Sequence, residues 1–228
     1  MLAAGVRSSP DAAVALETLC RSYWYPLYAF VRREGYRQAE AQDLTQGFFT
    51  MLLEREDLRN VHPDKGRFRS FLLTALKHFL INEWQKSRVQ KRGGGKIILS
   101  LDFDSAETKF GMQPVETATP ESVFKRQWAL TLLANVQFRL RSEMETTGRG
   151  VLYEALQPHL AGDSKAGRYA DISGRLGMTE AAVKMAMSRL RKRYRELLRE
   201  EIAQTVSSEE EIDDEIRELF DALRMSVS

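Results

Sequence analysis

Apolar residues recur at every third or fourth position along most of this chain, and no run alternates apolar and polar residues as a strand does. This spacing places the apolar side chains of a helix on one face, whereas a half-buried strand requires strict alternation. With 43% hydrophobic residues, the chain also has enough apolar side chains to build real cores. The spacing therefore predicts an all-α protein made of amphipathic helices.

Three long helices are expected in the first half of the chain, over residues 11–33, 38–55 and 68–92. Gly35 ends the first of them, because glycine adopts the left-handed conformation that follows many helices. The residues expected inside are Leu16, Leu19, Tyr23, Leu27 and Phe30 in the first helix, Leu44, Phe48, Met51 and Leu52 in the second, and Phe68, Phe71, Leu72, Ala75, Phe79 and Trp84 in the third.

A break in the pattern separates two halves. It begins at Gly93-Gly94-Gly95 and continues as a poorly periodic stretch to Pro120, so we predict a flexible linker over 93–120. The chain is expected to form two helical domains, 11–92 and 121–206, followed by an acidic tail at 207–228. The helices expected after the linker cover residues 121–141, 151–160, 168–176, 179–201 and 208–223.

The segment from Tyr169 to Val183 has the features of a helix-turn-helix. Ile172 and Leu176 share one helix face, and Gly177 stands where the turn requires a left-handed residue. Thr179 then caps a new helix. This combination favours a DNA-reading motif in the second domain.

The second helix of this motif has a basic outward face. We expect four of its residues to approach base edges and two to hold phosphates. The first group is Lys184, Met185, Ser188 and Arg189, and the second is Arg191 and Lys192. The alternative is an ordinary solvated amphipathic helix, since basic amphipathic helices are common.

Four segments together resemble the extracytoplasmic-function (ECF) family of bacterial RNA polymerase sigma factors. They are Tyr23-Trp24-Tyr25-Pro26-Leu27-Tyr28-Ala29-Phe30, the run from Ala39 to Phe49 with Asp43-Leu44-Thr45-Gln46, Gly66-Arg67-Phe68-Arg69-Ser70-Phe71-Leu72, and Tyr169 to Arg195. The resemblance implies a sigma factor that binds core RNA polymerase and promoter DNA. Its first domain would dock on polymerase and melt the −10 element, and its second would read the −35 element.

The resemblance also implies roles for particular residues. The docking surface for polymerase corresponds to Asp43, Gln46 and Phe49, although Asp43 as a helix-start residue and Phe49 as core remain the alternative. The face toward the −10 element corresponds to Lys77, His78 and Asn82. Bases interleaved with aromatics on the same segment are expected to track phosphates; they are Arg67, Arg69, Lys86 and Arg88. Gln42 and Gly47 depart from the family, which often has acids there.

The sequence gives little support for catalysis. Its three histidines, His62, His78 and His159, lack metal-ligand spacing, and Gly93-Gly94-Gly95 lacks the context of a phosphate-binding loop. We therefore expect no enzyme activity, no metal and no cofactor. A single cysteine and the absence of a long apolar run indicate a cytoplasmic protein without membrane contact.

Other functions remain open from sequence. One is a free-standing helix-turn-helix regulator that does not dock on polymerase, and another is a protein-interaction module that binds a sigma factor. The sequence does not decide whether an anti-sigma factor binds the chain.

The acidic tail combines eight acids between Glu209 and Arg224 with apolar residues at helical spacing. Such a helix requires a partner for its apolar face. We predict that it folds back, covers apolar surface and partly screens the basic face of the DNA-reading helix. The alternative is a solvated tail that aids solubility.

Overall fold

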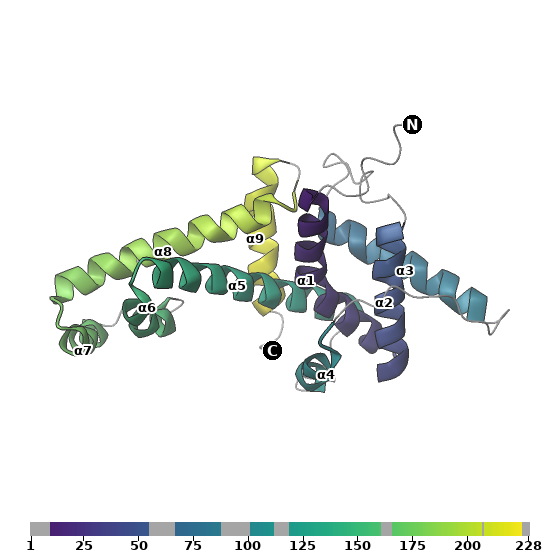
Figure 1. The fold of residues 1–228 in the computed structure, drawn as a ribbon, viewed down its shortest axis with the longest axis horizontal. Coiled ribbons are helices and arrows are strands. Elements are labelled where there is room, and N and C mark those ends of the chain that lie inside the picture. The colour runs from purple at the N-terminus through teal and green to yellow at the C-terminus, as the bar shows by residue number, and fades with distance from the viewer. Residues whose placement is uncertain are drawn as a thin grey trace. The chain divides into compact units, whose positions relative to one another are not determined.

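The computed structural model describes residues 10–54, 67–87, 101–111, 119–160, 166–206 and 208–224, and all regular secondary structure in these ranges is helical (Figure 1). The all-α prediction is confirmed. The helices are α1 (Pro10–Arg33), α2 (Gln38–Glu54), α3 (Phe68–Ser87), α4 (Phe103–Gly111), α5 (Pro120–Thr146), α6 (Gly150–Leu156), the 3-10 helix η3 (Gln157–His159), α7 (Ala166–Leu176), α8 (Glu180–Ala203) and α9 (Glu209–Arg224).

The chain forms two compact units that differ from the predicted domain ranges. Unit 1 comprises residues 1–131 and 205–228, and unit 2 comprises residues 132–204. Helix α5 therefore contributes its first part to unit 1 and the remainder to unit 2. The acidic tail, which we had separated as 207–228, belongs to unit 1 because α9 packs there.

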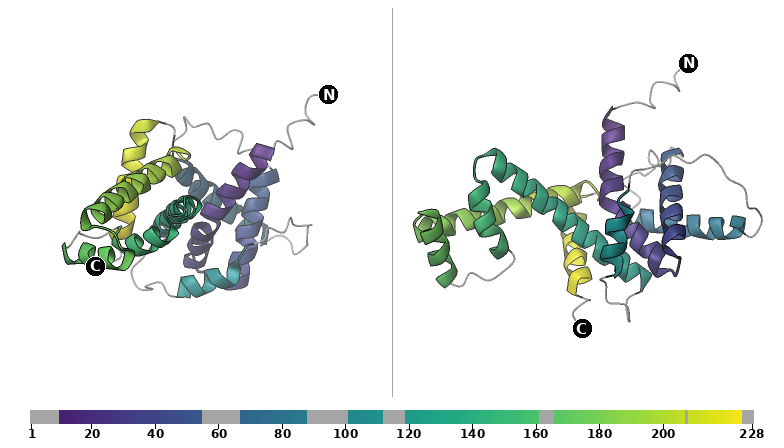
Figure 2. Two further views of the ribbon diagram at one scale, coloured as in Figure 1. Left: turned by 60° about the vertical axis from the view of Figure 1, so that its left-hand side comes forward. Right: turned by 60° about the horizontal axis from the view of Figure 1, so that its bottom comes forward.

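Unit 1 is built on α1, α2 and α3. Helices α1 and α2 lie side by side and are joined by a tight turn at Gly35, whose φ of +97° suits glycine (Figure 2). Apolar side chains from all three helices form the core, and its largest members are fully buried. They are Leu27, Tyr28, Phe30, Phe48, Leu72 and Leu76.

The buried stripe of α3 differs from the predicted one. Leu72, Leu76 and Leu80 are buried, whereas Trp84 is 53% exposed and its assignment to the core was wrong. Phe68, Phe71, Ala75 and Phe79 are half-buried at the edges of the stripe. Because α3 has apolar residues on more than one face, its sequence alone does not define the phase of its buried stripe.

Helix α4 lies within the segment that we predicted as a flexible linker. It packs on α1, where Trp24 and Phe103 meet edge to face with ring centroids 5.6 Å apart. Glu107 accepts hydrogen bonds from Tyr28 and from Arg32 Nε, both at 2.6 Å. This part of 93–120 is therefore an ordered helix fixed to unit 1; residues 93–100 and 112–118 lie outside the described residues.

Unit 2 contains the second part of α5 together with α6, η3, α7 and α8. Its core is formed by Leu140, Leu156, Met187 and Leu197, all fully buried. The Tyr153 hydroxyl donates to the Gln137 carbonyl at 3.3 Å and links α6 to α5. Helix α7 lies at the N-terminal end of α8 (Figure 1). These two helices of unit 2 contain the segment that we predicted to be a helix-turn-helix.

Helix α9 folds back onto unit 1. Its apolar stripe of Ile212, Leu219 and Ala222 is buried, so the expectation that the tail covers apolar surface is met. A carboxylate on this buried face, that of Glu215, pairs with Arg67 and Arg69 in unit 1. We had predicted that the tail screens the bases of the DNA-reading helix α8, and these two arginines are not on α8.

Among the described residues, none of the helices has the length and apolar character that a membrane span requires.

Candidate nucleic-acid interface

A tight turn fixes the start of α8. Gly177 has φ +63°, a left-handed conformation that other residues rarely adopt. Thr179 is extended (φ −75°, ψ 150°), and its hydroxyl accepts a hydrogen bond from the Ala182 amide at 3.2 Å. Such an N-cap satisfies one of the free amides in the first turn. The predicted roles of Gly177 and Thr179 in ending α7 and starting α8 are therefore confirmed.

Helix α8 separates a buried face from a basic one. The buried positions repeat at helical spacing; they are Val183, Met187, Leu190, Leu197, Leu198 and Ile202. Tyr194 lies in the same stripe and is half-buried. Between Glu180 and Arg195 the helix has six basic residues and one acid. Four of these bases, Lys184, Arg189, Lys192 and Arg195, are exposed, so this half of α8 has a positive surface of the kind that attracts phosphates.

Five of the six residues predicted to read the −35 element are exposed. Met185 is 56% exposed, so its side chain is available for an apolar contact. Lys184 lies 3.7 Å from Glu180, and Lys192 lies 3.9 Å from Glu196. These pairs are within one exposed helix, so they hold the lysines weakly. The remaining exposed residues of the set are Ser188 and Arg189.

Arg191 differs from the rest of the predicted set. It is half-buried, and its Nη2 donates to the backbone carbonyl of His159 at 3.0 Å. This bond ties the end of η3 to α8. We had expected a phosphate contact for Arg191, and the structure gives it an internal partner.

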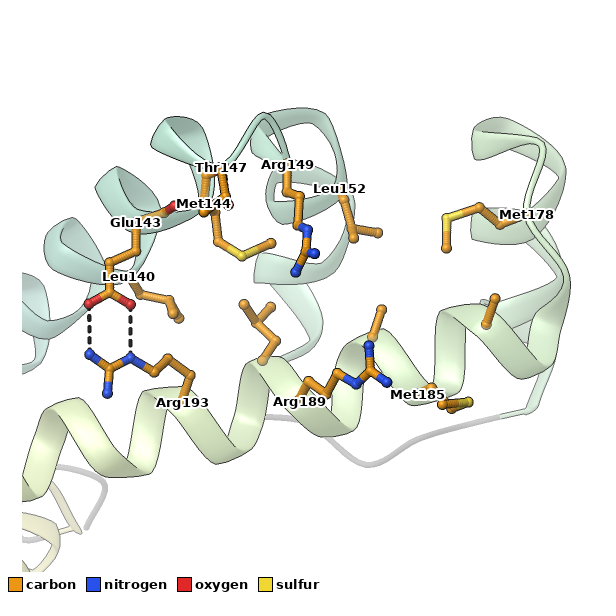
Figure 3. A pocket seen from close by; sticks show the side chains of 13 residues that line it. Leu140, Glu143, Met144, Thr147, Arg149, Leu152, Met178, Met185, Arg189 and Arg193 are labelled. Atoms are coloured by element: carbon orange, nitrogen blue, oxygen red, sulfur yellow. Dashed lines mark hydrogen bonds and ion pairs between the residues drawn. The ribbon is translucent and has the colours of Figure 1, made fainter.

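A groove that the sequence did not reveal runs along α8 in unit 2 (Figure 3). Its volume is about 450 Å³, and its walls come from α5, α6 and α8. Met185 and Arg189 line the α8 side, and Met144, Arg149 and Leu152 lie across from them. Two residues of the predicted base-reading set therefore stand at the border between the outward face and this mostly apolar groove.

The groove is bordered by a two-pronged ion pair. Arg193 donates from Nε and Nη2 to the two oxygens of Glu143, each at 2.8 Å (Figure 3). Hydrogen bonds from Arg193 lower the pKa of the Glu143 carboxyl, against the effect of partial burial. The bidentate geometry fixes α8 against α5. The spacing of Arg193 and Glu143, 50 residues apart, gives no sequence signal for this pair.

The bases at the start of α3 are held internally. Arg69 is 4% exposed and donates from Nη2 to Glu215 at 2.9 Å, while its Nε also pairs with that carboxylate. Arg67 Nε lies 3.1 Å from the same carboxylate, and its Nη1 pairs with Glu218. We had expected Arg67 and Arg69 to hold DNA phosphates, and in this structure both guanidinium groups are occupied by α9.

The remaining residues predicted for the −10 element are on α3. His78, Asn82 and Lys86 are exposed, and Lys86 pairs with Glu83 one turn earlier at 2.8 Å. Lys77 is half-exposed and donates to Glu121 at 2.6 Å. Arg88 lies outside the described residues.

An open groove of about 490 Å³ lies beside these residues in unit 1 and was also not predicted. Its wall includes the exposed Trp84 and Ile81, and Tyr36 and Lys77 lie at its border. Trp84 was assigned to the core from its spacing, and its exposure is what distinguishes this surface.

The prediction that Phe49 belongs to the polymerase-docking surface is wrong. Phe49 is 3% exposed and packs edge to face against Phe48, with ring centroids 5.8 Å apart. The buried stripe of α2 includes Thr45 and Phe49 and leaves Leu44 half-exposed, so we had placed the stripe slightly out of phase. Asp43 is exposed and Gln46 is half-exposed, so both remain on the surface.

Comparisons with known proteins add no relative. Neither a scan against protein-family models, nor a search of curated proteins, nor a search of solved structures gives a match.

Within the described ranges, no three His, Cys, Asp or Glu side chains are grouped so that they could hold a metal ion.

Proposed function

We propose that this chain is a sigma factor of the extracytoplasmic-function type, which binds core RNA polymerase and directs it to promoters. The observation that carries the proposal is the exposed basic face of α8, which follows a glycine turn and a threonine cap directly. A helix presented in this way enters the major groove in helix-turn-helix proteins. Lys184, Met185, Ser188 and Arg189 would then meet base edges of the −35 element, and Lys192 a phosphate.

The exposed part of α3 supports a second contact with DNA. Trp84 and the bases Lys77 and Lys86 lie on the same helix, and two of these three side chains are mostly exposed. An aromatic surface beside positive charge suits unpaired bases, because stacking holds the base and the cation holds its phosphate. In the proposal this region of unit 1, with His78 and Asn82, contacts the melted −10 element.

In the proposal unit 1 contains the polymerase-docking domain and unit 2 the helix-turn-helix domain. Asp43 and Gln46 on α2 form the docking surface, without Phe49. The role is one of binding, with no catalysis and no cofactor, and its place of action is the cytoplasm. Core RNA polymerase and promoter DNA are the partners that the role requires.

Binding to purified core polymerase tests the docking assignment. The double variant Asp43→Lys/Gln46→Lys should bind at least about tenfold more weakly, because two positive charges replace an acid and an amide at the contact. A matched control is Glu154→Lys/Gln137→Lys, which makes the same chemical change at exposed positions of unit 2 and should bind as the unaltered protein does.

Three other outcomes would change the proposal. Equal polymerase affinity of both double variants, with unchanged circular dichroism, would remove α2 from the docking surface. Failure of the unaltered protein to bind polymerase, combined with sequence-specific DNA binding, would favour the free-standing regulator. Failure to bind either partner would contradict the proposal altogether.

A further inference from the structure

Helix α9 covers the two arginines at the start of α3 with its own carboxylates. Glu215 is 1% exposed and contacts both Arg67 and Arg69, and Glu218 also pairs with both. Asp214 lies at the edge of this group, 4.0 Å from Arg67. Residues three and four apart share a helix face, so α9 presents these acids as one negative surface.

Arg69 is held on its other side by α5. The Arg69 guanidinium carbon lies 4.6 Å from the centre of the Trp128 ring, in cation–π geometry. Trp128 is hydrogen-bonded to Tyr23, and burial raises the pKa of the Tyr23 hydroxyl. Arg69 therefore packs on the Trp128 ring, with its hydrogen-bond donors directed toward the carboxylates of α9.

A guanidinium group presents to a phosphate the same paired N–H donors that it presents to a carboxylate. Arg67 and Arg69 have these donors committed to Glu215 and Glu218, so neither is free for a phosphate while α9 is in place. Occupation by α9 and occupation by nucleic acid are thus mutually exclusive at Arg69.

Ion pairs and a short apolar stripe both attach α9 to the rest of unit 1. Its buried apolar residues are three, Ile212, Leu219 and Ala222, beside the buried Glu215. A buried ion pair gives little net stability compared with separated, hydrated charges, because desolvation offsets most of the attraction. A competing polyanion would replace these ion pairs with its own and would have to offset the burial of the apolar stripe.

The connection before α9 also reaches α3. The Thr205 carbonyl accepts a hydrogen bond from the Phe68 amide at 3.1 Å, which satisfies a donor in the first turn of α3. Since Arg67 and Arg69 flank Phe68, the position of the segment before α9 is linked to the same turn that holds the two arginines.

We propose that α9 is an internal competitor of nucleic acid, whose carboxylates occupy at Arg67 and Arg69 a site for DNA phosphates. The inference rests on the proposed function, because it requires that unit 1 contact DNA. It deepens that function by adding regulation: the free protein keeps this site closed, and DNA that engages it displaces α9.

Two charge-matched double variants of the full chain test the competition. Glu215→Gln/Glu218→Gln removes the carboxylates that hold the arginines, and Glu209→Gln/Glu210→Gln removes two exposed acids at the start of the same helix. The probe is a fluorescent DNA duplex with an unpaired central segment, and binding is followed by anisotropy. The first variant should bind about tenfold more tightly than the unaltered protein, within the usual range of coupling between competing sites. The second should change affinity by no more than about twofold, through general charge alone.

Hydrogen exchange of the unaltered protein supplies a second readout that needs no substitution. Saturating DNA should speed the exchange of amides within Ile212–Leu223 and leave those within Leu27–Val31 of α1 unchanged. This measurement decides the matter if Glu215→Gln/Glu218→Gln does not fold by circular dichroism.

Equal affinities of the two double variants, or unchanged exchange in α9 at saturating DNA, would overturn the inference while leaving DNA binding through α8 intact. Absence of DNA binding by all three proteins, with and without core polymerase, would overturn the proposed function and the inference together.

Discussion

Two basic clusters of this protein differ completely in their surroundings. On α8, Lys184 and Lys192 are exposed, and the acids near them are on the same helix at 3.7 and 3.9 Å. At the start of α3, Arg69 is buried against Glu215, an acid 146 residues later in the chain. The two clusters look alike in sequence, so basic residues alone do not identify a nucleic-acid surface. What separates them is whether a distant acidic segment packs on them.

The difference has energetic consequences. Exposed pairs on a helix contribute a few tenths of a kcal/mol and are screened by salt. A buried pair such as Arg69–Glu215 contributes little as a unit, but removing one partner leaves the other buried charge with fewer ion pairs than before. Substitutions in the α8 cluster should therefore change DNA affinity and leave stability nearly unaltered, whereas substitutions in the α3 cluster should change stability as well as DNA affinity.

The largest effect is expected from Arg69→Ala. This change leaves the buried Glu215 with Arg67 as its remaining partner, and it should lower the free energy of unfolding by up to about 3–5 kcal/mol. The double variant Arg69→Met/Glu215→Leu removes both charges and should recover most of the loss. Urea titration measures both, with Lys192→Ala as the exposed control, expected within about 0.5 kcal/mol of the unaltered protein. A loss no greater than that of the control would show that the two clusters do not differ in this way.

The next effect concerns DNA affinity through α8. Arg189→Ala should weaken promoter binding by about 1–3 kcal/mol and relax preference at one base pair, if the guanidinium pairs with guanine. Lys192→Ala should instead weaken all sequences alike and reduce the salt slope by about 0.9. Anisotropy titrations on single-base variants of the site, at several salt concentrations, separate these responses. Uniform weakening by Arg189→Ala would assign that residue to a phosphate.

A smaller effect is expected from Thr179→Ala, which removes the N-cap at the start of α8. Loss of the hydrogen bond from Ala182 to the Thr179 hydroxyl should cost about 1 kcal/mol of stability. Thr179→Ser retains the acceptor and should restore most of it. Thermal unfolding measures both variants, and identical stabilities of the alanine and serine variants would contradict a capping role.

The smallest effect is a pH dependence at Arg193–Glu143, the partly exposed counterpart of Arg69–Glu215. Because hydrogen bonds from Arg193 lower the folded-state pKa of Glu143, its stabilising contribution is complete above the ordinary carboxyl value of 4.5 and is lost as pH falls through the lower folded value. Solvent screening limits the contribution to under about 1 kcal/mol. Glu143→Gln should thus be less stable than the unaltered protein at neutral pH, and the gap should close in acid. A gap independent of pH, measured by urea unfolding, would exclude this ionic contribution.

Local signals in the sequence predicted the helices well. Thr179 and Gly177 define the start of α8 and the end of α7 because caps and left-handed turns act within a few residues. Helix α4 was missed because its nine residues contain too few apolar positions to give a clear period.

Tertiary packing explains what the sequence did not reveal. Phe49 and Trp84 were misplaced because α2 and α3 have apolar residues on adjoining faces, and only packing against neighbouring helices selects which face is buried. The pairing of Arg69 with Glu215 was missed for a different reason. An acidic helix identifies itself in sequence, but which arginines it meets depends on the folded positions of segments far apart in the chain.

Transcription by purified core polymerase on a library of genomic fragments tests the central claim most directly. With the unaltered protein, we expect run-off products from a limited set of start sites that core polymerase alone does not use. Lys184→Ala/Arg189→Ala/Lys192→Ala should lose these products, whereas Arg37→Ala/Lys109→Ala/Lys125→Ala, which removes three exposed bases of unit 1, should retain them. No added start sites with the unaltered protein, or equal activity of the two triple variants, would contradict the account.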